Sequence, residues 1–239
     1  MHFRRAAVLV AGMAAVLPSL AQTVRLEQMT WTEVRARVAA GTTTVIIPIG
    51  GTEQNGPAML LGKHNVRARV LAGEIAKRLG NAIVAPVVSY APEQGHARYP
   101  GTITISDTAF EGVLEGAARS FQQHGFRDIV LLGDHGGYQK DMARVAAKLN
   151  REWARTPVRV HVPPGYYREV EHAGLADTSL AMAVDKSLVN TDALAAVTPN
   201  KDGVHGDPRK ASADQGQLAM REIVETSVAQ IRKLQREAR

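Results

Sequence analysis

Two segments of the chain place a carboxylate and a histidine after an apolar run that ends in glycine. Glu53 and His64 follow the run at 45–49, and Asp134 and His135 follow a second run that ends at Leu132. Polar side chains at the carboxyl ends of parallel strands converge on one pocket at the edge of a sheet. One carboxylate and two imidazoles are a standard ligand set for a catalytic zinc ion with one open position. The pattern therefore indicates a metal-dependent hydrolase.

Two further clusters carry groups that could take part in chemistry. One is His96, and the other is the segment 171–179, which holds Glu171, His172 and Asp177. Carboxylate and imidazole ligands suit zinc, and they also suit manganese or iron.

Each of these residues also has a structural interpretation. A single histidine after a strand is more often a capping or packing residue than a ligand. We assign His124, at the end of a helix, and His161, inside a strand, to that structural class. Glu53 is different, because a carboxylate after a buried strand is costly unless it is paired or bound to a metal.

Strand and helix patterns alternate along the chain. The expected strands are 45–49, 82–88, 102–105, 128–132 and 158–162. The expected helices are 26–39 with a start at Thr30 or Thr32, 66–79, 106–124, 140–155, 178–184 and 212–237. Several strands are continuous apolar runs, which is typical of a parallel sheet covered on both faces. Polar loops at 89–101 and 163–177 are expected to form the walls of the active site.

The N-terminus has the layout of a secretory signal peptide. Arg4 and Arg5 precede an apolar run that ends at Leu20, and the segment 18–21 (PSLA) supplies small residues at a cleavage site. We expect residues 1–21 to be removed and 22–239 to form a single domain that is periplasmic or secreted. The alternative is an uncleaved N-terminal anchor; after cleavage we expect no stable membrane association.

Composition excludes several classes of protein. The chain has no cysteine, so disulfides, thiolate metal sites and cysteine nucleophiles are excluded. Its formal charge of +6 includes Arg4 and Arg5 of the expected signal peptide, and only 5% of its residues are aromatic. Nucleic-acid binding needs a basic stripe with aromatic platforms, so we expect no nucleic-acid partner.

Five motifs in order resemble those of the creatininase (creatinine amidohydrolase) family. The matching segments are 51–64 (GTEQNGPAMLLGKH), His96 with 100–102 (PGT), 133–138 (GDHGGY), 172–179 (HAGLADTS) and 203–208 (GVHGDP). The resemblance covers about residues 44–216. It implies a three-layer α/β/α fold with a mainly parallel sheet, and a homo-oligomer.

The chain departs from this family pattern at several positions. The family has a metal-bridging aspartate where this chain has His64, histidines where it has Asn55 and Ala58, and a glutamate where it has Leu175. The second acidic position of the segment 172–179 is Asp177. A carboxylate can bridge two cations, whereas a neutral imidazole offers one lone pair to one metal. The remaining ligands are Glu53, His64 and His135. They predict one metal ion where the family has two, and by ligand chemistry the expected ion is zinc.

The resemblance also assigns roles to the remaining polar residues. It makes His172 the acid/base that protonates the leaving nitrogen, with Asp177 to orient it. Asn55, His96 and Asp134 are expected behind the ligands or against the substrate.

The expected activity is metal-dependent hydrolysis of the C–N bond of a small or cyclic amide, in which the metal polarises the carbonyl and activates water. One alternative is an exported metal-binding pseudoenzyme without turnover. Another is lactonase-like or peptidase activity on the same fold.

Overall fold

The computed structural model describes residues 23–167 and 171–238. The expected signal peptide, 1–21, lies outside the described residues. In the described part, four parallel strands form one sheet in the order β2-β1-β3-β4. They are β1 (Thr44–Ile49), β2 (Ala82–Val84), β3 (Asp128–Gly133) and β4 (Arg159–His161). β1 and β3 are the two central strands and pair along their whole length, from Thr44 with Asp128 to Ile49 with Gly133.

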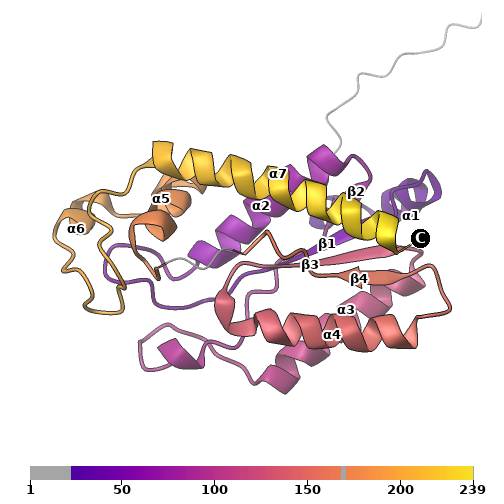
Figure 1. Cartoon of the computed structure of the whole chain (residues 1–239), viewed down its shortest axis with the longest axis horizontal. Coiled ribbons are helices and arrows are strands. Elements are labelled where there is room, and N and C mark those ends of the chain that lie inside the picture. Colours follow the sequence, from indigo (N-terminus) through magenta and orange to yellow (C-terminus); the bar gives the residue numbers. More distant parts are fainter. Residues whose placement is uncertain (1–22, 168–170, 239) are drawn as a thin grey trace, which may run out of the picture.

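Both faces of the sheet are buried, as the continuous apolar runs predict. Side chains alternate along a strand, so Val45 and Ile47 of β1 enter one core and Ile46 enters the other. The core with Ile46 is covered by α2 (Lys63–Leu79) and α7 (Ala213–Glu237). The opposite core is covered by α3 (Asp107–Gln123) and α4 (Gln139–Glu152). Figure 1 shows these helix pairs on either side of the sheet, which confirms the three-layer α/β/α fold.

Polar caps set the helix ends close to where the sequence predicts them. Thr30 caps α1 (Trp31–Ala39) through a reciprocal pair of hydrogen bonds with Glu33. Ser106 and Ser212 cap α3 and α7 with their hydroxyls. α2 ends at Gly80, whose φ of 82° is unfavourable for residues with a side chain.

Two expected strands differ from the structure. β2 ends at Val84 instead of continuing to 88, because Pro86 has no N–H to give to a sheet ladder. The segment 102–105 forms no strand in the described structure and contributes only isolated bridges, such as Thr52 with Ile103.

Two further helices, α5 and α6, lie at one end of the molecule. α5 (Leu175–Val184) begins three residues before the predicted start at 178, and α6 (Thr191–Ala195) is a single short turn. Short 3-10 helices occupy 26–28, 94–96, 136–138 and 186–188. In Figure 1, α5 and α6 lie at the left, beyond the N-terminal end of α2. None of the described helices has the length and hydrophobicity that a membrane span requires.

Candidate metal centre

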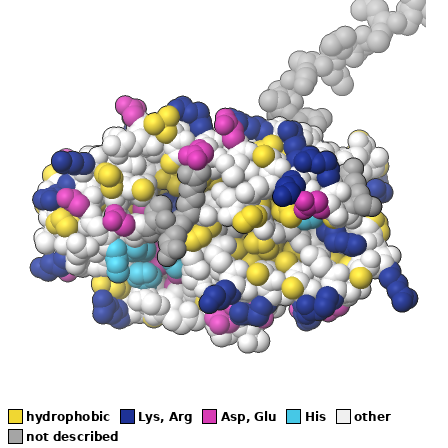
Figure 2. All heavy atoms as spheres, in the orientation of Figure 1, with side chains coloured by type: hydrophobic (Ala, Val, Ile, Leu, Met, Phe, Trp, Pro, Cys, Tyr) yellow, Lys and Arg dark blue, Asp and Glu magenta, His cyan; other side chains and the backbone are white. Residues whose placement is uncertain are grey.

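A polar cavity lies at the end of the sheet where β1 and β3 stop. Its volume is about 390 Å³. It is lined by Lys63, His64, Arg67, Gly95, His96, Asp134, His135, Tyr167, His172, Asp177 and His205. Figure 2 shows histidine side chains reaching the surface together at the end of the molecule that carries α5 and α6. The loops after two parallel strands therefore meet at one pocket, as expected for this class of sheet.

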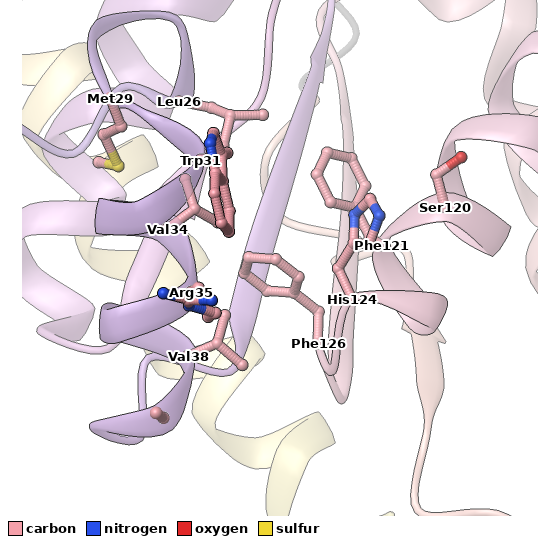
Figure 3. A pocket seen from close by; sticks show the side chains of 11 residues that line it. Leu26, Met29, Trp31, Val34, Arg35, Val38, Ser120, Phe121, His124 and Phe126 are labelled. Atoms are coloured by element: carbon pink, nitrogen blue, oxygen red, sulfur yellow. The ribbon is translucent and has the colours of Figure 1, made fainter.

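A larger hollow of about 790 Å³ lies between α1 and the end of α3 (Figure 3). Its walls are mainly apolar side chains, including Trp31, Phe121 and Phe126. Within 23–167 and 171–238, Arg35 and His124 are the only titratable residues that line it, and no carboxylate does. Because metal binding and hydrolysis need converging polar groups, we place the functional site in the smaller, polar cavity.

Four side chains in and beneath the polar cavity bring ligand atoms within 4.8 Å of one another. They are Glu53, His96, His135 and His172. Glu53 is fully buried, and its Oε2 has no hydrogen-bond partner among the described residues. A buried carboxylate oxygen without a partner is costly, and a cation in the cavity would remove that cost.

The charge states of these residues suit metal binding. Burial would raise the pKa of Glu53, but the hydrogen bond from His64 and its charge outweigh burial and hold that pKa well below its ordinary value. Burial lowers the pKa of His135 to about 4 and that of His172 to about 3. At neutral pH the site therefore holds a carboxylate and neutral imidazoles, the forms that bind metals.

His64 lies beside this group with both of its ring nitrogens engaged. Nε2 is 2.8 Å from Oε1 of Glu53, and Nδ1 is 2.7 Å from Oδ2 of Asp134. Nη2 of Arg67 also lies 3.2 Å from Nδ1. Protein groups therefore occupy both ring nitrogens, and neither directs a lone pair into the cavity. The geometry therefore favours His64 as a support for Glu53, and its predicted role as a ligand remains untested.

Asp177, the predicted catalytic carboxylate, is occupied by two buried cations. Lys63 pairs with Oδ2, and Arg67 Nη1 donates to Oδ1 at 2.6 Å. The main-chain N–H of Ala173 also donates to Oδ2. Asp134 is held similarly, because Arg67 Nε donates to its Oδ2 at 2.7 Å. Asp134 thus lies behind His64, on the side away from Glu53.

His172 and Asn55 have main-chain partners. Nε2 of His172 lies 2.9 Å from the carbonyl oxygen of Gln54, and its Nδ1 is 3.6 Å from Oε1 of Glu53. No direct bond joins His172 to Asp177 among the described contacts. The Asn55 amide donates to the carbonyl oxygens of Glu53 and Leu60, so it braces its own loop and does not line the cavity.

A model of the creatininase family, described as creatinine amidohydrolase, matches residues 27–231. The chain belongs to the creatininase family. The resemblance found in the five motifs is thereby confirmed. Relatives include the mycofactocin precursor peptide peptidase of Mycolicibacterium smegmatis, 29% identical over 214 residues that make up 80% of this chain and 85% of the relative. The creatinine amidohydrolase of Pseudomonas putida is 25% identical over 201 residues, which are 72% of this chain and 76% of the relative.

Solved creatininase structures share the fold. A tryptophan-to-alanine variant of creatininase superposes with a TM-score of 0.76 at 24% identity, over 90% of this chain and 99% of that one. Two others, one described as the Mn form and one as a Zn-Zn type variant, each reach a TM-score of 0.72 at 25% identity over 89% of this chain and 98% of theirs.

Four residues that shape the site of this creatininase-family member were not predicted from the sequence. Lys63 and Arg67 stand one turn apart on α2, and their spacing places both on the face that His64 shares. The side-chain nitrogen of Gln54 lies 2.8 Å from Nδ1 of His96 and 3.0 Å from Nε2 of His172. Glu93 is 2% exposed, and its Oε2 lies 3.1 Å from Nδ1 of His135. Burial and the charge of Glu53 raise the pKa of Glu93 to about 9. The only signal for these residues in the sequence is the short spacing of Lys63, His64 and Arg67, which places the three side chains on one side of a helix.

Proposed function

We propose that this creatininase-family protein is a metal-dependent hydrolase that cleaves the C–N bond of a small or cyclic amide. The observation that carries the proposal is the unpartnered Oε2 of Glu53 inside a ring of three histidines. Zinc and manganese both accept this donor set. A bound metal would supply Lewis-acid polarisation of a carbonyl and activation of water.

Glu53, His135 and His172 would hold the metal. Each of these side chains is at most one-fifth exposed, so the site excludes most bulk water. His64 supports Glu53 by donating to its Oε1, which leaves Oε2 turned to the histidines. The three residues come from the loops after β1 and β3 and from the segment before α5. Rigid strands and a buried ion-pair network therefore fix the donor atoms in advance of substrate binding.

The size of the cavity supports a small substrate. Its volume of about 390 Å³ lies at the lower end of the range for small-molecule sites. Of the two relatives named above, one is a creatinine amidohydrolase and the other a peptide peptidase. We favour a small or cyclic amide over a peptide, because a peptide needs a groove that lets both of its ends continue.

One observation favours a second candidate, a metal-binding protein without turnover. The ion pairs of Asp177 with Lys63 and Arg67 leave this carboxylate no free oxygen with which to orient a catalytic histidine. If hydrolysis required such an aspartate, the site would bind a metal and its ligand only.

The deciding experiment joins metal analysis to an activity panel. The protein is stripped with a chelator, reloaded with Zn²⁺ or Mn²⁺, and assayed on cyclic amides, formamides, lactones and short peptides, with Glu53→Ala as the control. We expect one metal ion per chain and hydrolysis of at least one small amide, both lost in the control. Full metal loading without turnover across the panel would reject the enzyme and leave the binding protein.

A further inference from the structure

The orientation of the Gln54 amide is determined by main-chain groups alone. The N–H of Gly56 donates to Oε1 of Gln54 at 2.8 Å, and Nε2 of Gln54 donates to the carbonyl oxygen of Gly203 at 3.1 Å. A main-chain N–H only donates and a carbonyl oxygen only accepts, so the oxygen and the nitrogen of this amide cannot be exchanged.

This amide determines which nitrogen of His96 carries the hydrogen. Nε2 of Gln54 lies 2.8 Å from Nδ1 of His96 and has a second hydrogen to donate. Nδ1 of His96 is therefore an acceptor, and the hydrogen of a neutral imidazole resides on Nε2. That Nε2 points to the site, 3.5 Å from Oε2 of Glu53.

His172 has the opposite arrangement. Its Nε2 lies 2.9 Å from the main-chain carbonyl oxygen of Gln54 and 3.0 Å from the side-chain nitrogen of Gln54. The carbonyl oxygen can only accept and is the nearer of the two, so we assign a hydrogen to Nε2 of His172, which leaves the second amide hydrogen of Gln54 to His96. The lone pair of His172 is then on Nδ1, 3.6 Å from Oε1 of Glu53. The two rings stack with centroids 4.3 Å apart. One ring offers the site a lone pair and the other offers it an N–H.

We propose that His96 is not a metal ligand but a neutral hydrogen-bond donor to the carbonyl oxygen of the substrate, with its tautomer set by Gln54. This inference rests on the proposed hydrolysis for the identity of the oxygen. An N–H directed at an amide carbonyl stabilises the negative charge that develops on oxygen during attack. The tautomer of His135 is not fixed in this way, because its Nδ1 faces both a donor, the Gly137 N–H, and the Glu93 carboxyl group.

The backbone at Gly203 supports the role of His96, because it holds the Gln54 amide in place. Gly203 has a φ of 85°, and a Cβ at this position would overlap the Gln54 amide. Glycine is therefore required at position 203, where the main-chain carbonyl accepts from the amide that orients His96.

The tautomer can be measured without any activity. Two-bond ¹⁵N–¹H correlation spectra of ¹⁵N-histidine protein, with His96→Gln to assign the signals, report which ring nitrogen is protonated. In metal-free and zinc-loaded protein we expect His96 with hydrogen on Nε2. A hydrogen on Nδ1, or an Nε2 shift typical of metal coordination in the loaded protein, would overturn the proposal.

Substitutions at His96 distinguish a hydrogen-bond donor to the substrate from a metal ligand. His96→Ala is expected to keep its metal affinity and to lower kcat by about 10²–10³-fold, the usual effect of losing one donor to a developing oxyanion. His96→Gln, which keeps an N–H donor, should recover part of that loss. A fall in metal affinity for His96→Ala as large as that for His135→Ala would overturn the assignment.

Gln54→Glu tests the control of the tautomer. A carboxylate accepts a hydrogen from Nδ1 of His96, so the lone pair moves to Nε2 at the site. We expect tighter zinc binding together with lower activity. Unchanged protonation of His96 in this variant would show that Gln54 does not set the tautomer. If the wild-type protein hydrolyses nothing, the proposed function fails, while the spectra and metal affinities still decide whether His96 is a ligand.

Discussion

Lys63 and Asp177 form an ion pair in which the two side chains are only 1% and 2% exposed. Arg67 lies one turn after Lys63 on α2 and forms ion pairs with both Asp177 and Asp134. The α2 N-terminus therefore inserts two cations between the carboxylates at the floor of the cavity. Because both oxygens of Asp177 are engaged, the structure gives this residue a role in positioning α2 and α5 against each other.

Removing Lys63 should destabilise the fold. Loss of one partner from a buried ion pair typically costs about 3–5 kcal/mol, since the other charge is left without compensation. Arg67 still contacts Asp177, so we expect Lys63→Met to lie near the lower value in urea unfolding. The matched control is Lys77→Met on the same helix, whose pair with Glu74 is exposed and should contribute less than about 1 kcal/mol. Equal effects of the two substitutions would contradict a structural role for the buried pair.

The ligand set predicted from sequence and the one favoured by geometry differ at His64 and His172. If the metal is held by Glu53, His135 and His172, then His172→Ala should lose most of the bound metal. His64→Ala should lower metal affinity by about 10–100-fold, as for a residue that orients a ligand. Equilibrium dialysis with zinc measures both. If His64→Ala binds no metal and His172→Ala binds a full equivalent, the ligand set predicted from the sequence is correct, and His172 keeps its predicted acid/base role.

Glu93 should make the stability of the metal-free protein depend on pH. Its folded-state pKa of about 9 lies above the ordinary 4.5. Between these values the unfolded chain releases a proton that the folded protein keeps, so stability falls as the pH rises through this window. Glu93→Gln lacks this proton and should show a flatter Tm profile between pH 5 and pH 9 in the presence of a chelator. Parallel profiles for the two proteins would refute a neutral Glu93.

We propose that the protein is exported, as the N-terminal sequence predicts. Cleavage after Ala21 would leave a mature N-terminus near Gln22. Intact-mass measurement of native protein from separated cell fractions tests this expectation. A periplasmic or secreted species that begins near Gln22 is expected. Full-length protein in the membrane fraction would favour the uncleaved anchor, and full-length protein in the cytoplasm would reject export.

Residue order alone was enough to determine the layers of the fold and part of the site. Continuous apolar runs before Glu53 and His135 predict parallel strands, and parallel strands bring the residues after their ends to the same edge. The pairing of β1 with β3 follows this expectation. Short-range patterns also place helix caps such as Thr30 and Ser106, because a cap depends on neighbours within one turn.

Only the tertiary structure decided how the polar groups share their hydrogens and charges. Lys63 and Asp177 are 114 positions apart, and Gln54 meets Gly203 across 149 positions. The sequence shows that these groups exist, but their roles depend on which atoms face each other after folding. His64 is a chemically suitable ligand until Glu53 and Asp134 occupy both of its nitrogens. Hydrogen bonds and ion pairs act over a few ångströms, so packing, and not residue type, separated the supporting residues from those free to bind a metal or a substrate.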